Sequence, residues 1–468
     1  MACILKLVVI LYKYIICVRS NFMENLKVSF ASDFICDGVE GNAEVAIDYS
    51  WFEKDSLEFN YDLATFCAKM AILGYDTPEI TDEVTATGFN NRQVHLEAML
   101  RGLGFADIEI NGCAARDEMS YYIARKEMEL ATGTYNLVFT AFMGSYKRQW
   151  FSNFDPNGVD REANDGKGYA GNEEKGIVHL GFADARDYMY QQLTAYMDKY
   201  PSEFETKMLM MGHSRGAAAA NLLAAKLFNK THGFGTHLIK AENLYTYCLA
   251  TPNPIAISAI DDNPDYDRIF SILNPEDFVT MVFPEKNGFG KYGKKFSLLG
   301  TDNLKASAYA DVKADMQQYF KEFVKGREFH PYKKGNTTAQ NVTSVMANTV
   351  TDFDSFYVIK MRECFKTVTV YEYFKDTLCT FIAGGTTEEE LAAVNKAMYM
   401  MLFSAVDLIG TSPKLRKISA FFVFKEGIGG ATGNKIGATY FGDSHRPDTY
   451  TAYLLSLNEK ALMENSNK

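Results

Sequence analysis

A serine stands between two glycines at residues 212–216, in the sequence Gly-His-Ser-Arg-Gly. Four apolar residues precede this segment, and the alanine-rich stretch 217–220 follows it. A strand before the turn and a helix after it would expose the hydroxyl of Ser214 at the carboxyl edge of a sheet, ready to attack a carbonyl carbon. The N-terminus of that helix would also direct partial positive charge toward an oxyanion formed there. The alternative is a tight strand-to-helix turn without chemistry.

A serine hydroxyl needs a base to remove its proton, and the sequence contains seven histidines. His213 adjoins the serine, but the turn directs neighbouring side chains to different places, so we expect it to pack at the flank. His445 precedes a C-terminal amphipathic segment and could swing back to the serine from that junction. His330 lies in a mainly helical region, where a surface position is ordinary, and is the less favoured base.

A carboxylate must orient the imidazole of such a base. In α/β-hydrolases the chain order is serine, then acid, then histidine. Asp277 fits this order, because it lies four residues after the apolar run that ends at Leu273. Glu276 is the alternative acid, and we expect it to be solvated. The residues therefore predict a triad of Ser214, Asp277 and His445.

The elements that would position this triad alternate between strands and helices from about residue 60 to 275. Apolar and β-branched runs of this kind indicate strands buried on both faces of a sheet. The predicted strands are 134–142, 207–211, 243–250 and 268–273, and the predicted helices are 60–75, 91–105, 119–130 and the segment from 182 onward. This alternation predicts an α/β fold, with a mostly parallel central sheet flanked by helices.

The first 22 residues are predicted to form an apolar N-terminal extension. Lys6 and Lys13 interrupt its apolar run, which is too short for an ordinary membrane span. Residues 1–22 loosely resemble a signal peptide, and a misassigned start is the alternative. A cytoplasmic location is slightly favoured, whereas a true signal would imply a secreted or membrane-associated protein.

The remaining chain divides into three predicted regions. Residues 303–434 have long amphipathic and aromatic-rich segments, which predict a mainly helical insertion that sits above the site as a cap. The glycine-rich segment 425–437 does not have dinucleotide-binding spacing, and we expect it to be a loop. The predicted regions are an α/β-hydrolase core at 23–302, the helical insertion at 303–434, and a C-terminal return to the core at 435–468 that carries His445.

Composition excludes several classes of function. The formal net charge is −11 and no lysine or arginine tract is present, so we expect no nucleic-acid partner. The eight cysteines form no C-x-x-C pair, so a zinc site of the usual spacing is absent and reduced thiols are favoured. We predict no metal and no cofactor. The expected partner is a small-molecule ester or lipid, and a transient contact with a lipid interface is compatible with this.

Four blocks of the sequence resemble the class 3 (fungal-type) lipases, with this chain as a divergent, bacterial-like member. They are LVFTAFMGSYKRQWFSNFD at 137–155, VHLGFADA at 178–185, MGHSRGAAAANLLA at 211–224, and YTYCLATPNP with ILNPEDFVTMVFP at 245–254 and 272–284. The resemblance covers about residues 60–300 and the segment around His445, but not the insertion. It implies an α/β-hydrolase fold and a catalytic triad of Ser214, Asp277 and His445.

The same resemblance implies an oxyanion hole. Ser145 takes the place of the family's threonine, and its hydroxyl and N–H, with the N–H of Arg215, would bind the developing O⁻. Met143 replaces the family's arginine, which puts the bracing of this loop in question. Arg215 replaces the common leucine and would place a charge near the mouth of the site. His179 would be structural, orienting the loop under the turn.

The predicted function is that of a serine hydrolase that cleaves carboxylic esters, of the lipid or acylglycerol type, through an acyl-enzyme. The sequence does not separate a lipase from an esterase, thioesterase, amidase or acyltransferase, because the triad is common to them. The alternative is a catalytically inactive hydrolase-fold scaffold that binds an acyl or protein ligand under its helical cap.

Overall fold

The computed structural model describes twelve parts of the chain. The described residues are 24–32, 39–74, 96–112, 115–145, 149–153, 167–231, 233–275, 277–281, 285, 288–299, 310–323 and 445–466. Several expectations lie outside them: those for residues 1–22, for the segment 425–437, for Glu276 and His330, and for most of the insertion 303–434. Among the described residues, no helix is both long and apolar enough to span a membrane.

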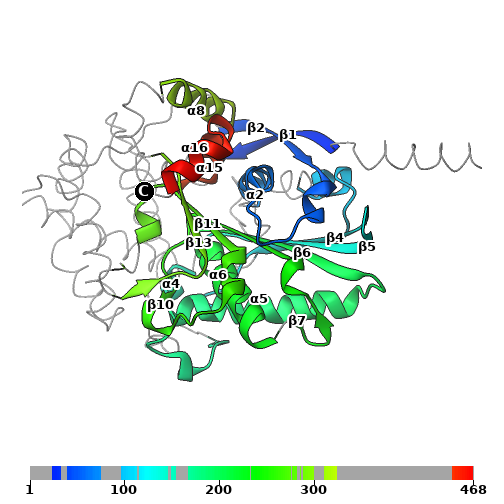
Figure 1. The fold of residues 1–468 in the computed structure, drawn as a ribbon, viewed down its shortest axis with the longest axis vertical. Coiled ribbons are helices and arrows are strands. Elements are labelled where there is room, and N and C mark those ends of the chain that lie inside the picture. The colour runs from blue at the N-terminus through cyan, green and yellow to red at the C-terminus, as the bar shows by residue number, and fades with distance from the viewer. Residues whose placement is uncertain are drawn as a thin grey trace, which may run out of the picture.

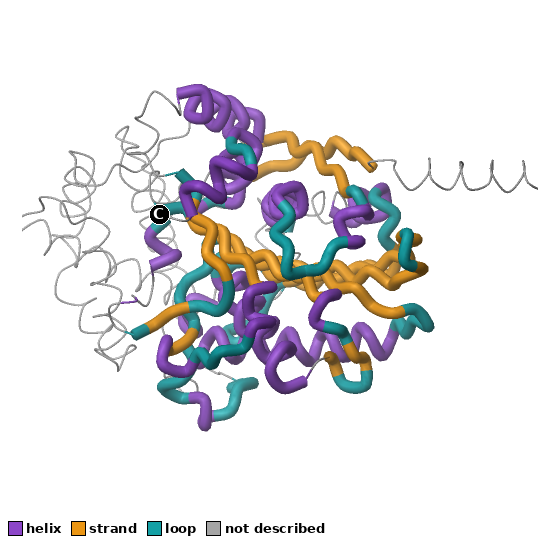
Figure 2. The backbone as a smooth tube through the Cα atoms, viewed as in Figure 1, coloured by secondary structure: helices purple, strands orange, loops and turns teal. Residues whose placement is uncertain are grey.

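A mostly parallel, seven-stranded sheet forms the centre of the described structure (Figures 1 and 2). Five neighbouring strands run parallel, and the two strands at one edge each pair antiparallel with the strand before them in the sheet. The order across the sheet is β13 (Lys294–Ser297), β11 (Ile269–Leu273), β9 (Leu244–Leu249), β6 (Glu205–His213), β5 (Gly133–Phe142), β4 (Tyr121–Leu130) and β3 (Ala106–Asn111).

Helices cover both faces of this sheet, as Figure 1 shows. One face carries α2 (Tyr61–Leu73), α8 (Ala310–Phe323), α15 (Pro447–Ser456) and α16 (Glu459–Ser466). The other face carries α5 (Leu180–Lys199) and α6 (Arg215–Lys226), and the short α4 (Gln149–Asn153) contacts α5. This arrangement confirms the predicted α/β-hydrolase fold, with a mostly parallel sheet flanked by helices.

The central strand β6 is buried on both faces. Leu209 and Met211 pack into the core beneath α2, while Met208 and Met210 pack into the core beneath α5 and α6. All four side chains are fully buried. Burying one side chain of this size stabilises a fold by about 1.5–3 kcal/mol relative to leaving it exposed. The strand that leads to Ser214 is therefore held firmly from both sides.

The prediction of a helix at 119–130 is wrong, because this segment forms strand β4. Tyr122 and Ala124 enter the core beneath α2, while Tyr121 and Ile123 enter the opposite core, which is the period of two of a doubly buried strand. The whole of β4 pairs with β5 in an antiparallel hairpin that turns just before Gly133, where φ is +138°. Sheet pairing thus overrides the helical preference of its Ala, Glu, Met and Leu residues.

Smaller elements surround the sheet. The strands β1 (Glu24–Ser32) and β2 (Val39–Ile47) form an antiparallel pair. Two short antiparallel pairs are β7 (Gly233–Phe234) with β8 (His237–Leu238), and β10 (Ile255–Ala256) with β12 (Phe289–Gly290). Single turns of helix are η1 (Tyr49–Glu53), η3 (Asn172–Glu174), η4 (Leu227–Thr231), η5 (Ala241–Asn243), η6 (Ile257–Ala259), η7 (Pro264–Arg268) and η8 (Phe278–Met281).

The described part of the predicted insertion is helix α8. It contacts α15 and β2, and its Met316 and Phe320 are buried in the same core as the side chains of α15. The stretch in which α8 lies was expected to be a long amphipathic segment of a mainly helical region. The start of the insertion therefore packs directly beside the C-terminal segment that follows His445.

The cysteines at positions 67 and 248, which lie in the described part of the chain, carry free and fully buried thiols. Burial raises the pKa of both thiols well above its usual value. Neither group is therefore a thiolate near neutral pH, and both serve as packing residues.

Candidate active site

Ser214 occupies a strained turn between β6 and α6. Its backbone has φ = 58° and ψ = −125°, a combination that non-glycine residues rarely adopt and that costs on the order of 1–3 kcal/mol. Its N–H donates to the carbonyl of Leu249 at the end of the neighbouring strand β9, at 3.0 Å. The surrounding sheet thus holds Ser214 in a backbone conformation that is unfavourable for an isolated serine.

At both flanking glycines another part of the backbone lies so close that only glycine fits. A Cβ on Gly212 would lie 2.3 Å from the carbonyl oxygen of Gly216, across the turn. A Cβ on Gly216 would lie 2.1 Å from the carbonyl oxygen of Phe142, at the end of β5. Neither site has room for a side chain, so the glycines let α6 start close against the sheet.

The structure brings together the three residues of the predicted triad. Nε2 of His445 lies 2.9 Å from Oγ of Ser214, and Nδ1 of His445 lies 2.8 Å from Oδ2 of Asp277. All three side chains are buried. Because an ionised carboxylate only accepts, Nδ1 carries the hydrogen, and Nε2 of the neutral ring accepts from the serine hydroxyl. This geometry is the one required for nucleophilic activation of a hydroxyl.

Asp277 is held by two further donors. The N–H of Val279 donates to Oδ1 at 2.9 Å, and the hydroxyl of Tyr450 donates to Oδ2 at 2.8 Å. The Tyr450 oxygen itself accepts from the N–H of Asn274 at 3.0 Å. That bond fixes the phenol, so its hydrogen is directed at the carboxylate. Sequence reasoning missed Tyr450, because nothing in its spacing from His445 shows that it faces the acid.

His213 is fully buried and packs against His445, as expected of a packed flank. Its Nε2 lies 2.9 Å from the carbonyl oxygen of His445, and the two rings are 4.9 Å apart. Burial, and then the neighbouring His445, lower the pKa of His213 well below its usual value. The neutral ring can therefore donate to that carbonyl and hold the backbone that carries the imidazole of His445.

The N-terminus of α15 fixes the position of His445. Arg446 follows it and is fully buried, with Nε donating to Oδ2 of Asp448 at 2.9 Å. The guanidinium also lies over the ring of Phe320 in α8, 6.0 Å from its centroid. Pro447 occupies the first turn of α15, where its missing N–H is tolerated. The predicted loop-to-helix junction is thus a tightly packed corner.

The predicted oxyanion residues are linked through Asn153. Ser145 follows β5, and Arg215 is the first residue of α6. The amide Nδ2 of Asn153 donates to Oγ of Ser145, and Nη1 of Arg215 donates to Oδ1 of Asn153 at 2.9 Å. Met143 is buried and its N–H donates to the carbonyl of Ser120 at 3.0 Å, which braces the loop through the backbone.

The expectation that Arg215 places a charge near the mouth of the site is wrong. The residue is only 1% exposed, and its guanidinium points inward to Asn153 and to the carbonyl of Arg116. Burying a guanidinium requires hydrogen-bond acceptors, and these two oxygens supply them to Nη1 and Nη2. Asn153 is a site residue that sequence reasoning missed, although it lies in the block at 137–155 that resembles the lipases.

His179 caps helix α5 beneath the site, as the predicted structural role requires. Its Nδ1 accepts from the N–H of Phe182 at 3.3 Å, so Nε2 carries the hydrogen and donates to the carbonyl of Asn153 at 3.1 Å. Burial, followed by the charge of Arg215, lowers the pKa of His179 to about 3. The ring therefore stays neutral and keeps one tautomer.

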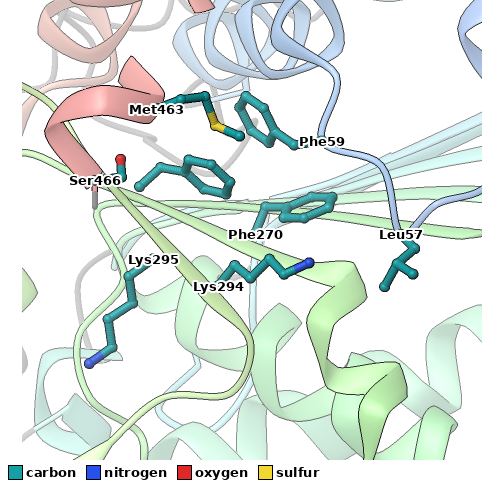
Figure 3. A pocket seen from close by; sticks show the side chains of 8 residues that line it. Leu57, Phe59, Phe270, Lys294, Lys295, Met463 and Ser466 are labelled. Carbon is teal, nitrogen blue, oxygen red and sulfur yellow. The ribbon is translucent and has the colours of Figure 1, made fainter. Parts of the chain in front are cut away.

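A pocket of about 440 Å³ lies at the edge strand β13 (Figure 3). Two lysines contribute to its wall, and each is paired: Lys294 with Asp267 at 3.5 Å, and Lys295 with Glu285. Its lining is Leu57, Phe59, Phe270, Lys294, Lys295, Phe296, Met463 and Ser466. This lining includes no triad residue, so the pocket is separate from the Ser-His-Asp chain. The described residues contain no cluster of metal-ligating side chains.

A family model matches part of this chain. Residues 139–287 match the family model "Lipase (class 3)". This match confirms the resemblance to class 3 lipases and supports a lipase-type hydrolase. No curated protein matches the chain.

Similar solved structures are fungal lipases. The Rhizomucor miehei lipase propeptide complex is 20% identical, over 52% of this chain and 68% of that one, with a TM-score of 0.30. Lip2 lipase from Yarrowia lipolytica is 18% identical over 54% and 78%, with a TM-score of 0.32. Lipase II from Rhizopus niveus is 15% identical over 55% and 85%, with a TM-score of 0.29.

Proposed function

We propose that this chain, whose residues 139–287 match the class 3 lipases, is a serine hydrolase that cleaves carboxylic esters of the lipid or acylglycerol type. The observation that supports it most strongly is the continuous hydrogen-bonded chain from Ser214 through His445 to Asp277, with distances of 2.9 and 2.8 Å. A merely structural turn would not need three buried polar groups in this order.

The reaction follows from these contacts. Nε2 of His445 takes the proton as Oγ of Ser214 attacks the ester carbonyl, and the imidazolium then donates it to the leaving alcohol. Asp277 stabilises the imidazolium and fixes the ring's tautomer. Water, activated by the same histidine, attacks the acyl-enzyme and releases the acid and the free serine.

The negative charge of the tetrahedral intermediate is stabilised from two sides. The N–H of Arg215 lies at the N-terminus of α6, and the hydroxyl and N–H of Ser145 come from the loop after β5. Losing one such donor costs on the order of 10²–10³ in kcat.

The decisive variant is Ser214→Ala. It removes the nucleophile while the turn remains, so we expect kcat for nitrophenyl esters to fall on the order of 10⁶-fold with the fold intact. Circular dichroism and thermal unfolding check the fold. Ser271→Ala is a matched control, because Ser271 is a fully buried serine in strand β11 of the same sheet and lies outside the triad.

A fluorophosphonate probe separates an enzyme from an inactive scaffold. The wild-type chain should be labelled at Ser214, and the Ser214→Ala variant should not. Wild-type protein that is folded yet neither labelled nor active would refute the proposal and favour a binding scaffold. Turnover by Ser214→Ala equal to that of the wild type would refute it equally.

Substrate length decides between a lipase and an esterase. A series of esters of increasing acyl length, measured below and above micelle formation, tests this part of the proposal. A rise in rate on long, emulsified esters is expected for lipid substrates. Fast turnover of short, soluble esters alone would limit the function to an esterase.

A further inference from the structure

The imidazole of His445 bridges two parts of the fold that are separate in the chain. It contacts Oγ of Ser214 at the start of α6 and Oδ2 of Asp277 in the turn after β11, at 2.9 and 2.8 Å. Because the ring between them is rigid, both contacts are short only while the nucleophile and the acid keep one separation. The turn of the acid must therefore be fixed relative to the helix of the nucleophile.

Lys291 follows β12, and its side chain reaches the turn of the acid. Its Nζ donates to the carbonyl of Thr280 at 3.3 Å and to the carbonyl of Thr251 in the loop after β9. Thr280 in turn donates to the carbonyl of Asp277 from Oγ1 at 2.8 Å and from its N–H at 3.2 Å. All four residues are buried. Lys291 thus holds the turn one contact away from the backbone of the acid.

The backbone beside Lys291 is fixed to the helix of the nucleophile. Asn221 lies in α6, is fully buried, and bonds twice to Tyr292, the residue after Lys291. Its Nδ2 donates to the Tyr292 carbonyl at 2.9 Å, and its Oδ1 accepts from the Tyr292 N–H at 3.1 Å. A link therefore runs from α6 through Asn221, Tyr292 and Lys291 to the turn of Asp277, without passing through the histidine.

A buried lysine side chain is costly in this position. Burial, followed by the charge of Lys295, lowers the pKa of Lys291 to about 7, while Glu285 and Asp277 act in the opposite direction. An apolar side chain would avoid that cost but would remove the donor from two buried carbonyl oxygens. The ammonium and the neutral amine both carry at least two hydrogens, so both contacts persist on either side of this pKa. Lysine therefore supplies a pair of donors that a hydrophobic residue lacks.

We propose that Lys291 is a positioning residue that ties the turn of Asp277 to the helix of the nucleophile and so sets the acid against the imidazole of His445. The inference rests on the proposed hydrolase function and deepens it. It gives a role in the reaction to a buried lysine outside the Ser-His-Asp chain. A small displacement is sufficient to matter, since misplacement of a group by about 1 Å can cost on the order of 10²-fold in rate.

The test compares Lys291→Met with Lys207→Met. Methionine is also unbranched, but it cannot donate to the two carbonyls. We expect Lys291→Met to lower kcat for a nitrophenyl ester on the order of 10–10²-fold, with KM little changed.

Lys207 is the matched control because it is also a buried lysine whose pKa is lowered by burial. It lies at the end of β6 opposite the nucleophile, and its Nζ donates to Oδ1 of Asn243 at 2.6 Å. Lys207→Met should therefore lose stability and keep kcat. An equal fall of kcat in both variants would assign the effect to a general loss of stability and overturn the proposal.

A proton resonance reports the contact between acid and base directly. The hydrogen on Nδ1 of His445, which is donated to Asp277, should give a downfield proton signal that disappears in Asp277→Ala. We expect Lys291→Met to move this signal upfield, because the hydrogen bond to the acid lengthens, and Lys207→Met to leave it in place. An unmoved signal in Lys291→Met, or wild-type kcat in that variant, would overturn the proposal.

A double-mutant cycle with Asp277→Ala separates positioning of the acid from a general loosening of the fold. Once the carboxylate is removed, Lys291→Met should lower kcat no further, because the group that it positions is gone. Additive losses in the double variant would contradict the proposal.

Two measurements keep the outcomes distinct. Thermal unfolding shows whether each variant folds, and Asn221→Leu, which cuts the same link at α6, carries the test if Lys291→Met does not fold. It should lower kcat and move the signal upfield, and wild-type values of both would refute the link. Labelling of the wild-type chain by a fluorophosphonate reports the nucleophile. Absence of labelling sinks the hydrolase function itself, whereas labelling together with wild-type kcat in Lys291→Met sinks only the positioning role.

Discussion

The hydroxyl of Tyr450 lies 2.8 Å from Oδ2 of Asp277 and donates a hydrogen bond to it. The same carboxylate oxygen receives the hydrogen of Nδ1 of His445, also at 2.8 Å. Two donors from one C-terminal segment therefore converge on a single oxygen of the acid. The carboxylate cannot rotate without breaking both contacts, so its orientation is fixed by the helix that follows the imidazole.

Replacing Tyr450 by Phe should reduce activity and stability together. The loss of a hydrogen bond to a charged group costs about 1.5–3 kcal/mol, and part of this should appear as a fall in kcat of roughly tenfold. The N–H of Asn274 also loses its acceptor, which adds a desolvation cost. Steady-state kinetics and urea unfolding measure the two effects.

Tyr245→Phe is the control for this change. Tyr245 is also buried and its hydroxyl donates to the carbonyls of Phe52 and Lys54, far along the chain from the triad. It should lose stability and retain kcat. Equal kcat in Tyr450→Phe and the wild type would show that the phenol does not orient the acid.

Acidification should destabilise the fold through its buried histidines. Burial lowers the pKa of His179 to about 3, below the usual 6.5, and lowers the pKa of His213 well below that value. Below pH 6.5 the unfolded chain binds protons that these folded rings exclude, so their contribution to stability is lost as the pH falls. At pH 5 the His179 ring accounts for about 2 kcal/mol, and His213 acts in the same direction.

Urea unfolding at pH 7.5 and pH 5 measures this effect. His179→Asn keeps an oxygen that can cap α5 and cannot be protonated, so its free energy of unfolding should fall less on acidification than that of the wild type. An identical fall in both proteins would contradict the assignment of a buried, neutral His179.

Lys291 should continue this rise of stability with pH into the alkaline range. Its ammonium is buried behind the acid, where it donates to the carbonyls of Thr251 and Thr280, and burial lowers its pKa from 10.5 to about 7. Between these values the unfolded chain holds a proton that the folded protein has released, so stability rises with pH. From pH 7.5 to 9.5 the gain is about 2–3 kcal/mol.

Lys291→Met should abolish that rise, as measured by urea unfolding across the same range. Lys294→Met is the matched control, because it changes a partly exposed lysine of strand β13, paired with Asp267, and leaves Lys291 in place. If the free energy of unfolding of Lys291→Met still rose with pH, another group would be responsible for the rise.

Gly216→Ala should damage the nucleophile turn through steric contact. The new methyl would meet the backbone of Phe142 at 2.1 Å, and backbone cannot yield as a side chain can. We expect a loss of about 1–3 kcal/mol in stability together with a large fall in kcat, because the serine moves with the turn. Gly290→Ala serves for comparison, since its added Cβ meets only the side chain of Ile257. This variant should lose less stability and less kcat than Gly216→Ala.

Local patterns were sufficient to predict much of the fold. The runs at 134–142, 207–211, 243–250 and 268–273 all form strands, because doubly buried parallel strands have nearly continuous apolar sequences. The chain order of serine, acid and histidine then left few candidates, and the structure places the predicted three within hydrogen-bond distance.

The features that the sequence did not predict depend on contacts between residues that are far apart in the chain. Strand β4 has a helix-compatible composition, and only its pairing with β5 decides its conformation. Arg215 turns inward because Asn153, 62 residues away in the chain, offers an acceptor. Tyr450 meets Asp277 across 173 residues. No short-range pattern encodes these partners, so they became visible only in three dimensions.

The contact between α8 and α15 separates the placement of His445 from its distance along the chain. Helix α8 ends at Phe323, the described chain resumes at His445, and the two helices rest against each other. Packing between two helical segments, rather than closeness in sequence, therefore keeps the imidazole within reach of the hydroxyl.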